Sequence, residues 1–155
     1  MNEIYMQKAI GLAKKGMESG AGGPFGAVVV KGGKIIGEGY NNVILTNDPT
    51  AHAEITAIRN ACKTLDSYQL EGCTLYTSCE PCPMCLGAIY WARPEKVFYA
   101  CTRKDAANAG FDDHFIYGEL EKINEHRKIK FQNILRKKAL PLFTGWLEKP
   151  DKKQY

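Results

Sequence analysis

The chain has 155 residues, of which 45% are hydrophobic and 25% charged, as expected of one globular domain that spans residues 1–155. Its formal net charge of +4 fits a small anionic or neutral ligand or modest nucleic-acid contact, and it decides between neither. No apolar run approaches the roughly 18 residues of a membrane span, and the N-terminal segment lacks the apolar stretch of a signal peptide, so we expect a cytoplasmic protein.

The first half of the chain is predicted to form a helix, a hairpin and a second helix. The first helix is predicted from apolar residues at helical spacing: Met6, Ile10, Ala13 and Met17. A glycine-rich segment at residues 20–23 ends it. Residues 25–30 (FGAVVV) and 34–40 (KIIGEGY) flank a KGGK turn and predict a β-hairpin. Asp48 and Pro49 are typical of the N-cap and first residue of a helix. The apolar face of that helix would consist of Ile55, Ile58, Cys62 and Leu65.

The second half of the chain alternates strands and helices. A strand at 73–78 (CTLYTS), a helix at 83–93 and a strand at 96–101 (KVFYAC) are predicted in turn. Weaker patterns predict helices at 104–110 and 112–122, a final strand at 129–134 (IKFQNI) and a last helix at 140–149. This alternation favours a central sheet with helices on both faces. Right-handed β-α-β connections would make the later strands parallel, beside the antiparallel opening pair.

Residues 78–85 (SCEPCPMC) are the strongest functional signal, because clustered cysteines in a reducing compartment usually bind metal or act in catalysis. Cys82 is a plausible cap of the following helix and Cys85 lies in its first turn, where the helix N-terminus favours thiolates. His52 is near the start of the preceding helix, so the three side chains could converge on one zinc ion. Count alone would also allow a closed structural site that includes Cys79, but the turn at Glu80-Pro81 separates that thiol from the others.

Three protein ligands leave a fourth position for water, as in catalytic zinc sites. Zinc lowers the pKa of such a water to about 7. Glu54, two residues after His52, is not placed to share the metal and could serve as a general acid and base beside it. A lone His or C-x-x-C is more often structural, whereas H-A-E followed by P-C-P-M-C is much more specific.

The H-x-E…P-C-x-x-C pattern is the signature of zinc nucleobase deaminases. Together with the blocks GGPFGAVVV, NDPTAHAEITAIR, YTSCEPCPMCLGAIYWAR and DAANAGFDD, it resembles the small bacterial guanine deaminases of the cytidine-deaminase superfamily over residues 22–113. The resemblance implies a three-layer α/β/α fold with a five-stranded mixed sheet. It also implies hydrolysis of guanine to xanthine and ammonia, one zinc per chain, and homodimers with exchanged C-terminal segments.

Carried over to this sequence, the resemblance implies that zinc is held by His52, Cys82 and Cys85. It implies proton transfer by Glu54 and Asp113, and substrate contacts by Asn41, Phe25, Trp91 and Tyr155. A carboxylate such as Asp113 suits guanine, whose N1–H and 2-amino group are both donors.

The substrate-binding residues also have structural interpretations. Phe25 could pack in the core, Trp91 could pack its helix, Asn41 could belong to a turn, and Tyr155 could be a frayed end. Asp112 and Asp113 could form an N-cap pair, and only the resemblance favours Asp113 as the functional residue.

Other functions remain open. A deaminase of the same superfamily could act on cytosine, cytidine or adenosine in transfer RNA, and residues 122–138 carry seven Lys or Arg and one Glu that could meet phosphates. We interpret that segment as a solvated surface, so we do not expect nucleic acid as a partner. The remote alternative is a zinc-stabilised RNA-binding module without catalysis, in which Glu54 would be dispensable.

Overall fold

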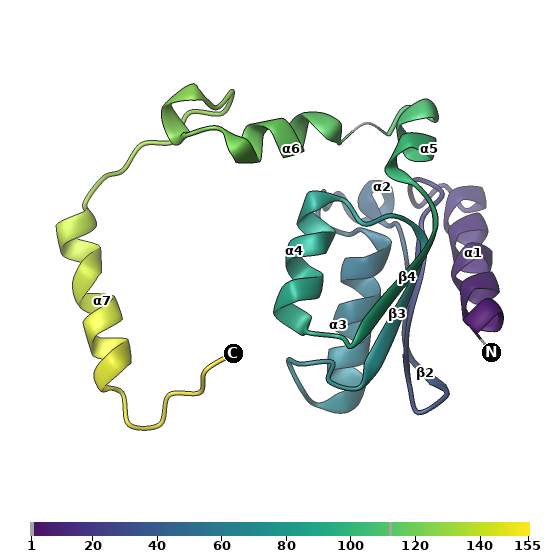
Figure 1. The fold of residues 1–155 in the computed structure, drawn as a ribbon, viewed down its shortest axis with the longest axis horizontal. Helices are drawn as coiled ribbons and strands as arrows, with labels where there is room; N and C mark the ends of the chain where they lie inside the picture. The colour runs from purple at the N-terminus through teal and green to yellow at the C-terminus, as the bar shows by residue number, and fades with distance from the viewer. Residues whose placement is uncertain (1, 112) are drawn as a thin grey trace. The chain divides into compact units, whose positions relative to one another are not determined.

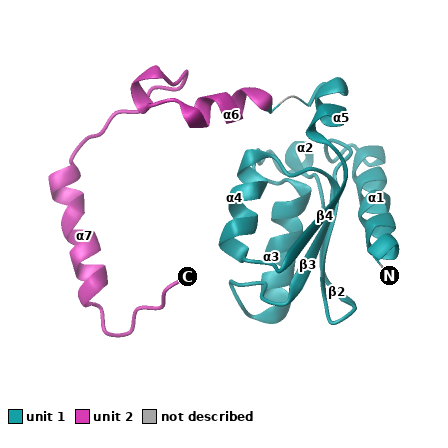
Figure 2. Cartoon of the chain, viewed as in Figure 1, with its two compact units in different colours: residues 1–113 teal, residues 114–155 magenta. Residues whose placement is uncertain are grey.

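The computed structural model describes residues 2–111 and 113–155. By internal contacts the chain divides into two units, Met1–Asp113 and His114–Tyr155, which are described separately below (Figure 2). The sequence-based assignment of one domain over 1–155 stays a prediction.

The first unit is built on a four-stranded mixed sheet in the order β2-β1-β3-β4 (Figure 1). Its strands are β1 Gly26–Lys31, β2 Lys34–Tyr40, β3 Cys73–Cys79 and β4 Lys96–Cys101. Strand β1 is antiparallel to both β2 and β3, whereas β3 and β4 are parallel. The predicted hairpin and the parallel later pair are therefore confirmed.

The prediction of a fifth strand over residues 129–134 is wrong. That segment belongs to the second unit, forms no strand, and exposes all six of its side chains. A strand is stable only when a neighbouring strand pairs with its backbone groups. Alternating apolar and polar residues favoured a strand here, but the pattern says nothing about whether such a neighbour exists.

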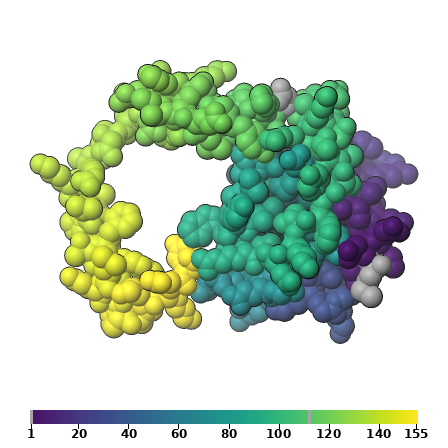
Figure 3. All heavy atoms as spheres, in the orientation of Figure 1, coloured from purple at the N-terminus to yellow at the C-terminus, as the bar shows by residue number. Residues whose placement is uncertain are grey.

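Helices cover both faces of the sheet, which confirms the three-layer α/β/α architecture (Figure 1). Helix α1 (Asn2–Glu18) lies on one face, where its Leu12 packs with Val28 and Val30. Helices α3 (Ala53–Leu65) and α4 (Pro83–Ala92) share the opposite face. Strand β1 is buried on both sides because its successive side chains point into alternate layers. Within the first unit, side chains fill the spaces between the ribbons of the helices and strands (Figure 3).

The buried face of α1 agrees only in part with the apolar spacing in the sequence. Ala13 is buried and Met6 packs against the core, but Ile10 and Met17 are each 48% exposed. The other buried residues are Ala9, Leu12 and Gly16. Small residues allow α1 to approach the sheet closely: a Cβ on Gly16 would lie 2.7 Å from the Tyr40 ring, and one on Gly26 would overlap the Ala9 carbonyl oxygen. Close backbone approach, rather than side-chain bulk, decided which face is buried.

Helix α3 begins later than predicted. The Asp48 carboxylate accepts hydrogen bonds from the Thr50 N–H (2.8 Å) and hydroxyl (2.7 Å), which stabilises a turn instead of a helix start. The N-cap of α3 is His52. A short helix α2 (Val43–Thr46), which was not predicted, follows β2. Helix α4 begins as predicted, with Cys82 as N-cap and Pro83 in its first turn.

Helix α5 (Arg103–Asn108) follows β4 at the end of the first unit. The second unit contains α6 (His114–Glu121), a 3-10 turn (Asn124–His126) and α7 (Arg136–Glu148), which extends the predicted last helix toward the N-terminus. Through residues 2–111 and 113–155, no helix is both long and apolar enough to cross a membrane.

Candidate active site

Three metal-ligating side chains meet where two helices begin. His52 is the N-cap of α3, Cys82 is the N-cap of α4, and Cys85 lies in the first turn of α4. Because α3 and α4 pack on the same face of the sheet, these two helix starts can present their side chains to one another. Pro83 fixes the start of α4, since its ring suits the first helical turn and the backbone N–H it lacks has no helical partner there.

The distances among these side chains fit a tetrahedral zinc ion. His52 Nδ1 lies 3.5 Å from Cys82 Sγ and 3.5 Å from Cys85 Sγ. Zinc–sulfur and zinc–nitrogen bonds of about 2.3 and 2.05 Å at a tetrahedral angle place the two ligand atoms about 3.6 Å apart. The ligand atoms of all three residues lie within 4.8 Å of one another. The two distances from His52 therefore match those of a tetrahedral zinc site, and all three ligand atoms are close enough to share one ion.

The electrostatics of the three side chains also suit a cation. A hydrogen bond from the Cys85 thiol, opposed by burial and aided by His52, lowers the pKa of Cys82 to about 4. The same hydrogen bond, together with burial, raises the pKa of Cys85. A hydrogen bond with Cys82 raises the pKa of His52, to which the charges of Glu54 and Asp113 add. A divalent cation would displace the Cys85 proton, because the thiolate is the form that binds metal.

Glu54 lies beside this cluster and is 5% exposed. Its Oε1 accepts a hydrogen bond from the Thr77 hydroxyl (3.2 Å), and its Oε2 accepts one from the Cys85 thiol (3.4 Å). Burial raises the pKa of this carboxyl. One carboxylate oxygen is thus anchored on β3, and the other faces the ligand cluster. A raised carboxyl pKa suits a group that must take up and return a proton near neutral pH.

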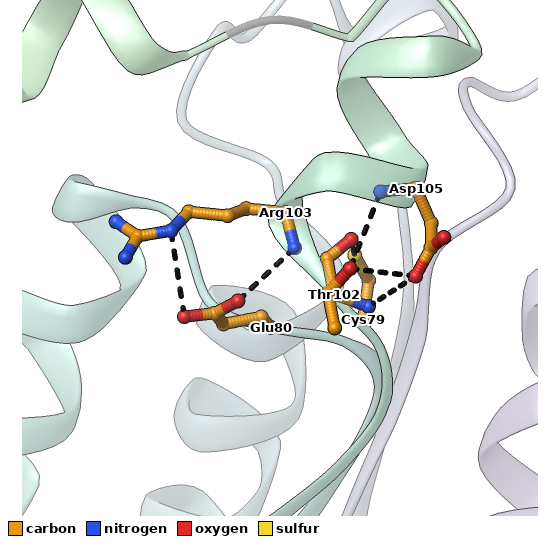
Figure 4. Close-up of polar contacts among 5 residues, drawn as sticks. All are labelled: Cys79, Glu80, Thr102, Arg103 and Asp105. Carbon is orange, nitrogen blue, oxygen red and sulfur yellow. Dashed lines mark hydrogen bonds and ion pairs between the residues drawn. The ribbon is translucent and has the colours of Figure 1, made fainter.

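Cys79 is not part of the cluster that could hold a metal in the described chain. This thiol is buried at the end of β3 and donates to the Thr102 carbonyl oxygen (3.5 Å; Figure 4). Burial raises its pKa to about 11, so it stays protonated at neutral pH. The next residue, Glu80, accepts a hydrogen bond from the Arg103 N–H (3.1 Å), so this turn is attached to the start of α5.

Asn41, Phe25 and Asp113 all belong to the same unit as the cluster. Asn41 is buried, and its Oδ1 accepts a hydrogen bond from the Val43 N–H (3.2 Å). The Asn41 N–H donates to the Phe25 carbonyl oxygen (3.0 Å), which ties these two residues together. Asp113 is half-buried, and its negative charge contributes to the raised pKa of His52. Asp112, the alternative carboxylate, lies outside the described residues.

Trp91 and Tyr155 are not brought to the cluster within the first unit. Trp91 is 64% exposed near the end of α4, nine residues beyond Cys82, or about 13 Å along the helix axis. Tyr155 belongs to the second unit. Their substrate contacts stay predictions.

Sequence reasoning overlooked three neighbours of the site: Thr77, Gly22 and Phe111. Thr77 holds Glu54, as described above. Gly22 leaves room for the Asn41 side chain, and Phe111 packs against Phe25. The GG pair before Phe25 was the available signal for a close approach, whereas nothing in the sequence pairs Phe111 with Phe25.

Comparison with known proteins agrees with this geometry. Residues 1–101 match the family model described as the cytidine and deoxycytidylate deaminase zinc-binding region. The chain is 58% identical to guanine deaminase of Bacillus subtilis (strain 168) over 154 residues, or 99% of each chain. It is 35% identical to the tRNA-specific adenosine deaminase of Aquifex aeolicus (strain VF5), covering 95% of this chain and 94% of that one.

A crystal structure of guanine deaminase from Bacillus subtilis superposes with a TM-score of 0.97 at 58% identity, covering 100% of this chain and 99% of the other. The fold, the His/Cys/Cys cluster and the matched region all indicate the same family. The protein belongs to the cytidine and deoxycytidylate deaminase family, whose shared region binds zinc.

Proposed function

We propose that this protein hydrolyses guanine to xanthine and ammonia at a zinc ion held by His52, Cys82 and Cys85. The observation that carries the proposal is the His/Cys/Cys cluster with a buried carboxylate beside it, in a chain that is 58% identical over its length to a guanine deaminase. A zinc ion held by these three residues would supply the nucleophile, because zinc lowers the pKa of a coordinated water to about 7.

Glu54 moves the protons of the reaction. Its Oε2 faces the cluster, while the Thr77 hydroxyl holds Oε1 and so fixes the plane of the carboxylate. As the water oxygen bonds to C2, the carboxylate accepts one proton from that water and donates it to the adjacent ring nitrogen. It then passes the remaining proton of the added hydroxyl to the amino group, whose bond to C2 breaks so that ammonia leaves and a C2 carbonyl forms. Burial raises the Glu54 pKa, which makes the acid form accessible during the cycle.

Asn41, Asp113 and Phe25 recognise the base. The Asp113 carboxylate accepts hydrogen bonds from N1–H and the 2-amino group of guanine, which adenine cannot provide in the same arrangement. It also assists the proton transfers. Since the Asn41 oxygen already accepts from Val43, its amide NH₂ remains to donate to the base. Phe25 supplies an aromatic surface against which a planar base can stack.

Gly22→Ala should disturb the base contact made by Asn41. A Cβ on Gly22 would overlap the Asn41 amide oxygen and lie 2.8 Å from the Asn41 carbonyl oxygen. We expect kcat/KM for guanine to fall on the order of 10- to 100-fold, because small displacements of positioning groups cost that much. The control is Gly11→Ala in α1, where a Cβ meets nothing within 4 Å. That change should leave activity intact and stabilise the fold by about 0.5–1 kcal/mol; an unaltered kcat/KM in Gly22→Ala would contradict the Asn41 role.

The finer features of the assembly belong to the same proposal. The protein is a cytoplasmic homodimer of single-domain chains that exchange their C-terminal segments, and Trp91 and Tyr155 line and close the pocket in that assembly. Large exposed apolar side chains support an exchange, because the second unit buries none of them by itself. They include Phe115, Leu142, Phe143 and Leu147.

Ammonia release by the zinc-loaded protein tests the substrate. We expect turnover of guanine, and none of guanosine, cytosine, cytidine, adenine or adenosine. Activity on cytosine without guanine would overturn the substrate while leaving the zinc mechanism intact. The second candidate is a deaminase of adenosine in transfer RNA, favoured by the 35% identical relative and the basic segment 122–138. It predicts salt-sensitive transfer-RNA binding, which the guanine deaminase assignment does not.

A further inference from the structure

Phe111 is placed where two substrate-binding segments meet. Its ring packs edge-to-face on Phe25, with centroids 5.0 Å apart and an interplanar angle of 85°. Gly23 makes this pairing possible, because a Cβ there would lie 2.9 Å from both rings. The contact therefore joins Phe25, the residue just before β1, to the segment that follows α5.

The segment that contains α5 is also held at its N-terminal end, by a capping box on α5 and by contacts between Arg103 and Glu80. The Thr102 N–H and hydroxyl donate to the Asp105 carboxylate (2.8 and 2.7 Å), and the Asp105 N–H donates to the Thr102 hydroxyl (3.3 Å), which caps α5. Glu80 accepts from the Arg103 N–H and lies 3.8 Å from Arg103 Nε (Figure 4). Glu80 lies two residues before Cys82. Its contacts with Arg103 therefore connect the start of α5 to the chain segment that carries the metal-ligating cysteines.

Between these two attachments the chain reverses direction. The Phe111 N–H donates to the Ala106 carbonyl oxygen (3.0 Å), and Gly110 has a φ of +91°, which ends α5. Asp113 follows Phe111 by two residues, a span of at most about 7 Å. Once the Phe111 ring is fixed against Phe25, the Asp113 backbone must therefore lie within about 7 Å of the Phe111 backbone.

We infer that Phe111 is a positioning residue for the reaction: by packing on Phe25 it holds Asp113 at the substrate, and it touches neither the base nor the metal. This inference rests on the role of Asp113 in the proposed function. It also explains why Gly23 precedes Phe25, since a side chain there would separate the two rings.

A double-mutant cycle with guanine as substrate tests the inference. Phe111→Ala should lower kcat/KM on the order of 10- to 100-fold, with zinc content unchanged. Asp113→Ala should lower it more, by about 10²–10⁴-fold, as for other groups that assist proton transfer. When Asp113 is already alanine, the further change Phe111→Ala should cost less than about two-fold, because its effect passes through Asp113.

The matched control is Phe98→Ala. This change also removes one contact between aromatic rings, because Phe98 stacks on Tyr76 with ring centroids 5.1 Å apart. Phe98 lies on β4, however, outside the segment that carries Asp113. Its kinetic constants should stay within about two-fold of those of the unaltered protein. Full additivity of Phe111→Ala and Asp113→Ala would overturn the inference while leaving the proposed function standing. An Asp113→Ala variant with full activity would instead overturn the role of Asp113 in the proposed function.

Discussion

Glu54→Gln is expected to lower kcat for guanine by about 10³–10⁴-fold while the protein keeps about one zinc ion per chain. Glutamine retains the shape of the side chain and an oxygen that can accept from the Thr77 hydroxyl, so the local structure should persist. It cannot take up and return a proton. Steady-state kinetics and metal analysis of the same preparation separate these two effects.

The stability of this variant provides an independent check. Because burial raises the pKa of Glu54, its ionised form is less favourable in the folded protein than in the unfolded chain. That cost is present above the folded-state pKa and disappears as the pH falls below the unfolded-state pKa. Glutamine carries no charge, so the metal-free variant should have a Tm at neutral pH equal to or above that of the unaltered protein.

A control and a contradicting result complete the test of Glu54. Glu95→Gln removes a carboxylate that is 61% exposed and lies 3.9 Å from the Nζ of the neighbouring Lys96, so its kinetics should not change. If Glu54→Gln kept kcat within ten-fold of the unaltered protein, another group would have to transfer the protons. Such a result would also revive the non-catalytic zinc module as an explanation.

Local patterns in the sequence predicted the central elements of the fold and the group of metal-ligating side chains. β-branched residues between glycines marked β1, and the Pro83 start of α4 placed Cys82 and Cys85 together. Both features depend on residues a few positions apart, which is the range over which capping and strand preferences act.

Contacts between distant segments could not be predicted in the same way. The sheet has four strands because residues 129–134 form none, and α3 starts at Ala53 because Asp48 forms a turn with Thr50. The pairing of Phe111 with Phe25 spans 86 positions of sequence and depends on Gly23. Periodicity carries no information on such tertiary choices.

Cys85→Ser is expected to abolish both zinc binding and turnover, and Cys79→Ser to preserve them. Cys85 is fully buried and 3.5 Å from His52 Nδ1, so a neutral hydroxyl there replaces a thiolate inside the first coordination sphere. The loss of zinc affinity should exceed the roughly 10–100-fold that outer contacts contribute. The protein should also lose the rise in Tm that zinc gives, since that rise requires metal binding to the folded state.

Cys79→Ser is the matched control, because it replaces a thiol of the same motif that is also buried. The Cys79 thiol donates to the Thr102 carbonyl oxygen, and a serine hydroxyl can make the same kind of contact. Among the described residues, Cys79 lies outside the group of side chains that could hold a metal, which consists of His52, Cys82 and Cys85. Loss of zinc in Cys79→Ser would mean that four protein ligands close the site, leaving no position for the water on which hydrolysis depends.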